Sequence, residues 1–405
     1  MFYFYLIFSG VYGLPTFLSD KRFGGQNPEE NLDTAGIISF FGYPSETHTV
    51  TTSDGYIIDI HRIPHGKNKT FDSDPDRPVI LLMHGLYEAS SCFVNNLPNE
   101  SAGFLFADAG FDVWLGNVRG NTYGRRHITL SAKQHEFWKF SWSEHANLDL
   151  SAIFDKIAEV TGQKQIYYLG HSQGTLIMFA QLAENVEFAA RIKRFFALAP
   201  VGSVKNIKGL IGAIEKVVWP VIDVVKLILR DIEFRENWIV QKAIEAICSS
   251  HFIQHYCADL IYFVTGPEFG NINMSRLDVY LSHAPAGSST RNMLHWAQLA
   301  HTGVMAKYDY RNRWENKKHY GQITPPIYDL GKIDPNLNLH IYSSDIDWLA
   351  DPEDVADTIS KLPTGTVKTK TTLHDVSHID FVWGLNAASL IYEPIIELVR
   401  TWDGL

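Results

Sequence analysis

The chain has 405 residues, of which 45% are hydrophobic and 20% charged, a composition that is ordinary for a globular protein and excludes extensive disorder. The formal charge is −10 and no basic run or stripe occurs, so the sequence argues against a nucleic-acid partner and against attraction to anionic membranes. The length exceeds what one core usually needs, so we expect one large domain with an inserted or appended piece. The 17 His residues would gain charge between about pH 7 and pH 5, which fits an acidic compartment.

The first 13 residues are predicted to be a signal peptide, because an apolar stretch is followed by small residues and the first charge is Asp20. A basic segment is missing at the start, so a membrane anchor and a buried N-terminal strand remain alternatives. No other run of 18 uncharged apolar residues occurs, and no transmembrane segment is expected after cleavage. Sequons at Asn68, Asn99 and Asn273 favour glycosylation and the secretory pathway, with the lysosome or the extracellular space as destination.

The chain has three Cys residues. Cys248 and Cys257 enclose a short segment that also holds His251 and His255. An oxidising compartment favours a disulfide between the two, with a zinc site or unpaired thiols as alternatives. Cys92 is then expected to be a small buried apolar residue.

Residues 44–202 are predicted to be the first part of an α/β core. Short apolar runs alternate there with helical segments, which indicates βαβ units on a mostly parallel sheet. The predicted strands are 47–52 and 56–63, which form a hairpin around Asp54-Gly55, then 79–83, 112–115, 165–169 and 194–198. The predicted helices are 101–109, 144–160 and 175–183.

Residues 203–330 are predicted to be a helical cap, because helical stretches dominate and the alternation with strands stops. In the clearest helix, 216–230, charged residues occupy one narrow face and apolar residues cover the rest, while Pro220 leaves its start open. So wide an apolar face predicts burial within the cap, a lid near 205–237 that contacts an apolar ligand, or both. The α/β core resumes over 331–405, with strands at 339–342 and 367–373 and helices at 353–362 and 387–400.

The strongest chemical motif is Gly170-His171-Ser172-Gln173-Gly174, which lies between a predicted strand and a predicted helix. A tight strand-to-helix turn of this kind projects the serine hydroxyl above the sheet and needs small neighbours. The helix that follows favours negative charge developing at its N-terminus. Ser172 is therefore predicted to be a nucleophile, and no Gly-Lys-Ser or Gly-Lys-Thr supports a phosphate loop instead.

A serine nucleophile needs a base and an acid, which follow it in this fold in the order Asp, then His. Asp347 and His378 each follow a late predicted strand, at the sheet edge where such folds build their sites. Asp345 and Asp351 are rivals for the acid, although Asp351 before Pro352 suits a helix N-cap, and His374 is a rival for the base. This chemistry needs no metal and no cofactor, and none is expected.

The tetrahedral intermediate of acyl transfer needs two N–H donors. One is predicted to be the backbone of Gln173, next to the nucleophile. The other is predicted to be Leu86, in the loop His84-Gly85-Leu86 after the central strand 79–83.

With these motifs the chain resembles the acid lipase family, the gastric and lysosomal lipases. The resemblance runs from about Pro44 to Trp402. The motifs that carry it are His84-Gly85-Leu86, Leu115 to Asn121, Gly162 to Gln165, Gly170 to Thr175, Ser275 to Tyr280 and Leu349 to Pro352.

The resemblance implies an α/β-hydrolase fold, the triad Ser172, Asp347 and His378, an oxyanion hole at Leu86 and Gln173, and a Cys248–Cys257 bridge. It also implies a lid near 205–237 and hydrolysis of triacylglycerols or cholesteryl esters at acidic pH. Ser343-Ser344 stands where the family usually has Gly-Gly, which could alter the turn that aims Asp347. A small-ester esterase or thioesterase and a non-catalytic lipid-binding protein are the alternatives, while an epoxide hydrolase would need a carboxylate at position 172.

Overall fold

The computed structural model describes residues 27–67, 77–234, 262, 264–267 and 270–404. A nine-stranded sheet crosses the molecule in the order β1-β2-β4-β3-β6-β7-β10-β11, with β5 paired to β2. The strands are β1 (Glu46–Thr51), β2 (Tyr56–Ile63), β3 (Val79–Met83), β4 (Asp112–Leu115), β5 (Arg126–His127), β6 (Ile166–His171), β7 (Ile192–Leu198), β10 (Leu339–Ser344) and β11 (Val367–Leu373).

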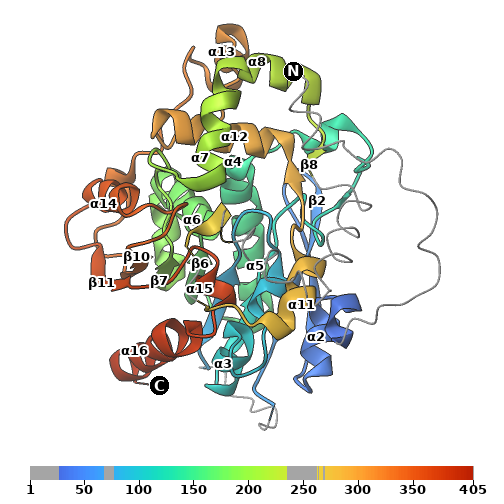
Figure 1. Cartoon of the computed structure of the whole chain (residues 1–405), viewed down its shortest axis with the longest axis vertical. Helices are drawn as coiled ribbons and strands as arrows, with labels where there is room; N and C mark the ends of the chain where they lie inside the picture. The colour runs from blue at the N-terminus through green and yellow to red at the C-terminus, as the bar shows by residue number, and fades with distance from the viewer. Residues whose placement is uncertain (1–26, 68–76, 235–261, 263, 268–269, 405) are drawn as a thin grey trace.

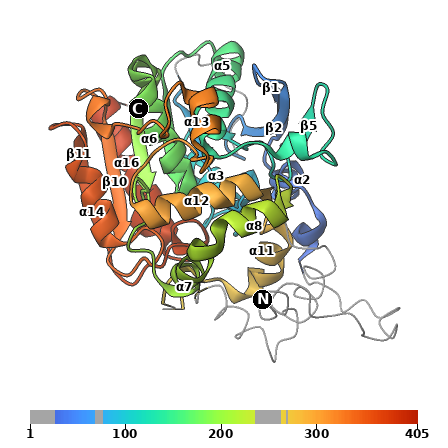
Figure 2. The same ribbon diagram turned by 90° about the horizontal axis from the view of Figure 1, so that it is seen from above.

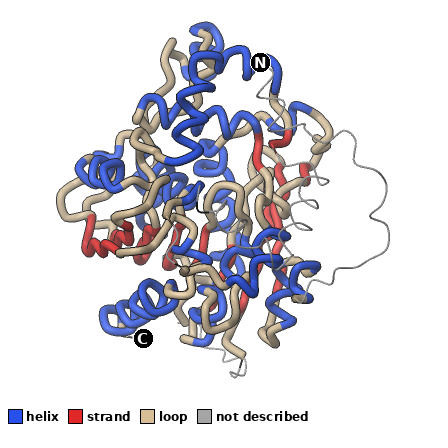
Figure 3. Tube along the Cα trace, in the orientation of Figure 1, coloured by secondary structure: helices blue, strands red, loops and turns tan. Residues whose placement is uncertain are grey.

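The sheet is mostly parallel, as predicted. The hairpin of β1 and β2 is antiparallel, and β2 is antiparallel to β4, whereas every pairing from β4 to β11 is parallel. Each residue of β3 is buried, as expected for a central strand covered on both faces. Figures 1 and 2 show helices on both faces of the sheet, and Figure 3 shows the strands running through the middle of the molecule.

The helices of the core are α2 (Thr34–Phe40), α3 (Ala102–Asp108), α4 (Trp142–Glu144), α5 (Leu150–Thr161), α6 (Gln173–Glu184), α14 (Pro352–Ser360), α15 (Asp380–Trp383) and α16 (Glu393–Asp403). The sequence predicts all of them except α2 and α15. Two predicted helices contain a wider π turn near their start, η4 (His145–Asp149) and η9 (Ala388–Tyr392).

The region 203–330 contributes α7 (Gly209–Val218), α8 (Ile222–Leu229), α11 (Leu277–His283), α12 (Thr290–Thr302) and α13 (Arg313–Tyr320). Figure 1 shows α7, α8, α12 and α13 together at the top of the molecule. A short two-stranded sheet, β8 (Glu233–Phe234) with β9 (Ser288–Ser289), joins the segment after α8 to the segment before α12. No helix among the described residues combines the length and the apolar character that crossing a membrane requires.

The predicted helix over 216–230, whose start Pro220 left open, begins at Ile222. The chain forms α7 up to Val218, a 3-10 turn η6 (Trp219–Val221), and then α8 from Ile222. Pro220 lies in the turn, and a proline there removes a backbone N–H and clashes with the preceding turn of an α-helix. The apolar face is therefore divided between two helices.

These two helices expose apolar side chains and also bury some. Ile222 of α8 packs with Leu294 of α12 and with Tyr308 in a small separate core. On the outside, 64% of Val217 and 75% of Leu227 are exposed, and Ile211, Ile214, Val221 and Val224 are exposed as well. Among the described residues, one face of this segment is thus internal packing and the other is exposed apolar surface, and the lid stays a prediction.

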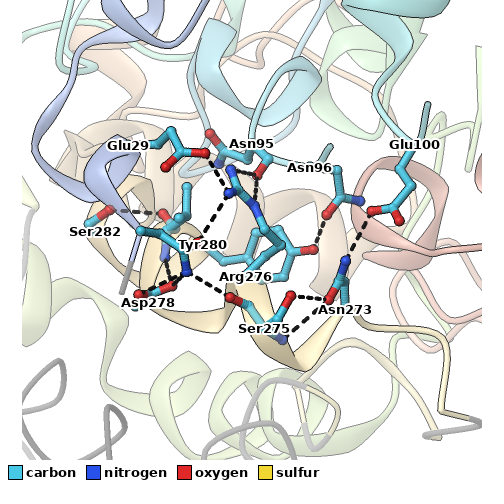
Figure 4. A network of polar contacts seen from close by, with 12 residues as sticks. Glu29, Asn95, Asn96, Glu100, Asn273, Ser275, Arg276, Asp278, Tyr280 and Ser282 are labelled. Atoms are coloured by element: carbon cyan, nitrogen blue, oxygen red, sulfur yellow. Dashed lines mark hydrogen bonds and ion pairs between the residues drawn. The ribbon is translucent and has the colours of Figure 1, made fainter. Parts of the chain in front are cut away.

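Arg276 connects α11 to the core. Its guanidinium is buried and donates two hydrogen bonds to the carbonyl oxygen of Asn95, at 2.9 and 2.8 Å. It also forms a 2.6 Å ion pair with Glu29, which is buried in η1 (Pro28–Asn31). Arg276 is the N-cap of α11, and Figure 4 shows it between these two partners, with Tyr280 of α11 directed at Asn96. The Glu29 carboxylate and the Asn95 carbonyl, which are far from Arg276 in the sequence, therefore both bind its buried guanidinium.

We expect Arg276→Met to lower the free energy of unfolding by about 3–5 kcal/mol, because it leaves the Glu29 carboxylate buried without its partner. Urea titration followed by circular dichroism measures the change. The double variant Glu29→Gln with Arg276→Met should recover part of the loss. Lys361→Met, which breaks an exposed pair with Asp357, should cost less than about 1 kcal/mol. Equal losses for Arg276→Met and Lys361→Met would contradict the expectation.

Candidate active site

Ser172 occupies the predicted strand-to-helix turn, between the end of β6 and the start of α6. Its backbone has φ 51° and ψ −114°, a conformation that L residues rarely adopt. The turn is fixed by a hydrogen bond from the Ser172 N–H to the carbonyl oxygen of Leu198 at 3.0 Å. Such strain in a non-glycine residue persists only where the surroundings enforce it, and it is concentrated at functional sites.

Glycines on each side make this turn sterically feasible. A Cβ on Gly170 would lie 2.8 Å from the carbonyl carbon of Gly174, and a Cβ on Gly174 would lie 2.4 Å from the carbonyl oxygen of Met83 in β3. Backbone atoms cannot move aside as a flexible side chain can. The Gly-x-Ser-x-Gly spacing is therefore a packing requirement of the strand β3, the strand β6 and the helix α6.

The three residues predicted as a triad come together in the structure. The Nε2 atom of His378 lies 2.8 Å from Oγ of Ser172. Its Nδ1 atom lies 2.8 and 3.1 Å from the two carboxylate oxygens of Asp347. All three side chains are buried, which strengthens charge interactions between them.

Asp347 is oriented by the loop that carries it. Its Oδ1 atom accepts hydrogen bonds from the N–H groups of Leu349 and Ala350, at 2.8 and 2.9 Å. Ser344, one of the two serines that depart from the family pattern, accepts a hydrogen bond from the Ile346 N–H at 3.2 Å with its hydroxyl. The turn before Asp347 is thus formed with serine, and the carboxylate faces His378.

The rival residues have other contacts. Asp345 and His374 pair with each other at 2.5 Å on the surface, where 76% of the His374 side chain is exposed. Asp351 is the N-cap of α14 and accepts the Glu353 N–H at 2.9 Å, as predicted. The described geometry therefore favours Asp347 and His378 over these alternatives.

Gln173 is the first residue of α6, directly after Ser172, so its N–H has no acceptor within the helix. Its side-chain oxygen accepts hydrogen bonds from Nδ2 of Asn292 at 3.0 Å and from Nε1 of Trp296 at 2.9 Å, both on α12. This contact joins the region 203–330 to the residue next to the nucleophile. Asn292 and Trp296 are not among the residues that the sequence motifs predict, because nothing local marks a partner 119 and 123 positions away.

Leu86, the other predicted donor, follows Gly85 in the loop after β3. The Gly85 peptide is held at both ends: its carbonyl oxygen lies 2.7 Å from Nδ1 of His84, and its N–H donates to Oε2 of Glu88 at 2.6 Å. Glu88 is buried and is also absent from the motif-based predictions. A signal was present, since it is the one charged residue among the apolar and small residues that follow the central strand.

Other predicted sites have different outcomes. Cys248, Cys257 and Asn68 lie outside the described residues, as do residues 1–13 of the predicted signal peptide. Cys92 is buried and unpaired. Asn99 is exposed, whereas the side chain of Asn273 is partly buried and bonded to Glu100 and Ser275. Over the described ranges, no group of three or more His, Cys, Asp or Glu side chains is arranged to hold a metal ion.

Several histidines in the interior stay neutral at acidic pH. Burial lowers the pKa of His61 to about 4, of His295 to about 3 and of His340 to about 4. His295 stacks on Trp142 with ring centroids 4.0 Å apart, and its Nε2 atom lies 2.8 Å from the carbonyl oxygen of Ala306. These groups do not add charge between pH 7 and 5, contrary to what the count of 17 histidines suggests.

Two families match the core. A family described as a partial alpha/beta-hydrolase lipase region matches residues 34–97, and the alpha/beta hydrolase fold matches residues 78–210. The second match contains Ser172 and both predicted oxyanion-hole residues.

Relatives match nearly the whole chain. Lipase lipl-1 of Caenorhabditis elegans is 46% identical over 378 residues, which are 92% of this chain and 93% of that protein. Lipase member K of Homo sapiens is 41% identical, covering 98% and 96%. Gastric triacylglycerol lipase of Homo sapiens is 40% identical, covering 92% of each.

Solved structures share the fold at low identity. A protein of Acinetobacter baumannii aligns with a TM-score of 0.52 and 12% identity over 95% of this chain and 99% of its own. The epoxide hydrolase VrEH1 of Vigna radiata aligns with a TM-score of 0.50 and 13% identity, covering 88% and 98%. At such identities the likeness shows the α/β-hydrolase fold and says nothing about chemistry.

Proposed function

The chain belongs to the lipases of the α/β-hydrolase fold, and we propose that it hydrolyses carboxylic esters of lipids with Ser172, His378 and Asp347 as its catalytic triad. The observation that carries this assignment is the continuous chain of contacts from the Ser172 hydroxyl through His378 to Asp347. It is the arrangement that general-base activation of a serine requires.

The reaction follows from these positions. Oγ of Ser172 attacks the ester carbonyl carbon while Nε2 of His378 takes the hydroxyl proton, and Asp347 stabilises the imidazolium through its Nδ1–H. The N–H groups of Leu86 and Gln173 receive the oxyanion of the tetrahedral intermediate. The C–O bond to the alcohol breaks as His378 protonates the leaving oxygen. Water, deprotonated by His378, then cleaves the acyl-enzyme and restores Ser172.

A long-chain lipid ester is the proposed substrate, either a triacylglycerol or a cholesteryl ester. The relatives named gastric triacylglycerol lipase support the first of these. The exposed apolar surface on α7 and α8 supports both substrates equally. Apolar side chains that are exposed side by side mark a surface that contacts lipid or another apolar partner. In this proposal residues 203–330 form a cap, and the segment from Lys205 towards 237 is the lid through which lipid reaches Ser172.

We also propose that the protein works at acidic pH and enters the secretory pathway. The apolar start of the chain and the exposed sequon at Asn99 support the secretory pathway. Acidic pH has a physical cost for this fold, because the buried histidines cannot take up protons that the unfolded chain binds. The free energy of unfolding at neutral pH must therefore be large enough to offset this loss in acid.

We expect Ser172→Ala to lower turnover of a soluble ester on the order of 10⁶-fold without unfolding, because only oxyanion stabilisation and binding would remain. Initial rates with a p-nitrophenyl ester and the circular dichroism spectrum measure the two properties. A fluorophosphonate should label the wild type and leave the variant unlabelled. A variant that keeps a tenth of the wild-type rate would show that Ser172 is not the nucleophile.

The stability of the protein should fall as the pH falls below about 6.5. The folded pKa of His295 lies below the unfolded value, so the unfolded chain binds more protons in this range and the stability is fully present only above it. From pH 6.5 to pH 4.5 this one residue costs on the order of 2 kcal/mol. His295→Phe, which keeps an aromatic ring on Trp142, should reduce the difference in melting temperature between pH 7.5 and pH 4.5. A His295→Phe protein whose difference in melting temperature equals that of the wild type would refute the explanation.

Polar substitutions on the exposed face of α8 should separate lipid hydrolysis from ester chemistry. We expect Val224→Ser with Leu227→Ser to lower the rate on emulsified long-chain triacylglycerol at least about tenfold. Transfer of apolar area from water contributes roughly 25 cal/mol per Å², and only the emulsified substrate requires it. The rate on a short soluble ester should stay within about twofold.

Ile222→Ser is the matched control, because Ile222 lies on the buried face of the same helix. It should lower the melting temperature and both rates together. If the double variant on the exposed face also loses both rates equally, the face is structural and the lid proposal is wrong.

A further inference from the structure

Beneath the nucleophile lies a buried acid that the triad mechanism does not use. Glu88 and His171 are both buried, with Oε2 of Glu88 3.1 Å from Nδ1 of His171. His171 is the residue immediately before Ser172. A hypothetical Cβ on Gly85 would lie within 3.2 Å of Glu88, His171 and Ser172 alike, so these groups are packed in one cluster.

Each member of this pair contacts a different part of the active site. Glu88 accepts the N–H of Gly85 at 2.6 Å, immediately before the proposed oxyanion donor Leu86. The Nε2 atom of His171 lies 3.0 Å from the carbonyl oxygen of His378, the proposed base. The pair therefore touches the oxyanion loop, the nucleophile turn and the base loop.

The positions of the protons follow from which atoms can only accept. A carbonyl oxygen accepts, so Nε2 of His171 carries a proton that it donates to His378. Oε2 of Glu88 accepts from Gly85, and it also faces Nδ1 of His171. A proton must lie between those two atoms, because two facing lone pairs would repel each other.

The charge of Glu88 decides where that proton is. Burial alone would raise the pKa of Glu88, but the neighbouring His171 and the Gly85 N–H together lower it below its ordinary value. An ionised Glu88 with two donors on one oxygen leaves both nitrogens of His171 protonated. Hydrogen bonds to an ionised group are stronger than neutral ones.

Building on the proposed function, we infer that Glu88 and His171 form a buried carboxylate–imidazolium pair that positions the oxyanion loop and His378 relative to Ser172. Both are positioning residues, since neither touches the reacting atoms. The pair acts on catalysis through the placement of Leu86 and His378, for which small displacements reduce the rate strongly.

Glu88→Gln tests the pair with almost no change of shape. If the amide oxygen takes the place of Oε2, it accepts from Gly85 and leaves the charge of His171 without a partner. If the amide nitrogen takes that place, it faces the Gly85 N–H as a second donor. The first orientation loses the negative charge that pairs with His171 and the second loses the hydrogen bond from Gly85, so we expect kcat on a soluble ester to fall about 10- to 100-fold while KM stays within about twofold.

Glu315→Gln is the matched control, because Glu315 pairs with His319 on the exposed surface of α13 at 3.7 Å. It should leave kcat and KM unchanged. A Glu88→Gln variant that is folded and retains kcat within twofold of the wild type would overturn the inference. Loss of activity in Ser172→Ala, measured beside it, keeps the proposed function intact in that case. Full activity of Ser172→Ala would instead overturn the proposed function.

A spectroscopic measurement on the wild type tests whether the Glu88–His171 pair exists, even if Glu88→Gln does not fold. The proton NMR spectrum of the wild type should contain two strongly downfield imidazole protons, one from His378 with Asp347 and one from His171 with Glu88. Asp347→Asn should remove the first and keep the second. A spectrum of Asp347→Asn with no downfield imidazole proton would show that the buried pair does not exist.

Discussion

The site depends on one strained residue. Ser172 can hold its hydroxyl above the sheet only with a positive φ, and this conformation places Gly170 and Gly174 against backbone atoms where no side chain fits. Three neighbouring elements enforce it: Met83 at the end of β3, Leu198 at the end of β7 and the first turn of α6. The strain is thus supported by the centre of the parallel sheet, the most buried part of the molecule.

Around this turn, the groups that proposed catalysis needs are held by contacts of long sequence separation. Asp347 and His378 follow the adjacent strands β10 and β11, so parallel pairing alone brings their loops to the same edge. The Gln173 side chain is bound by Asn292 and Trp296 of α12, and Arg276 joins α11 to the core through Asn95 and Glu29. The helices above the sheet are therefore attached both at the site and away from it.

Burial of ionisable groups has two opposite consequences in this fold. At the site it strengthens the interaction of His378 with Asp347 and makes a pair of Glu88 with His171 geometrically restrictive. In the core it keeps His61, His295 and His340 neutral, which makes the folded state less stable as the pH falls. An enzyme of this fold that works in acid must offset the second effect elsewhere in the molecule.

The sequence by itself determined the elements that have a local cause. The all-apolar run 79–83, the hairpin around Asp54-Gly55 and the Gly-x-Ser-x-Gly turn were each predicted from neighbouring residues, because strand burial, turn geometry and close packing of glycine are short-range constraints. The mostly parallel pairing of the strands followed from their alternation with helices. The loops that carry Ser172, Asp347 and His378 could be predicted because each of them follows a strand.

Only the tertiary structure decided what depends on distant partners. Pro220 divides a helix that hydrophobic spacing reads as continuous, and which apolar residues of α7 and α8 are covered depends on where α12 lies. Asp345 and His374 were separated from the triad only by pairing with each other at the surface. Glu88 shows the limit most clearly: its partners are a peptide N–H three residues away and a histidine 83 residues away. No local pattern encodes such a partner, because the fold alone brings the two buried groups within reach of one proton.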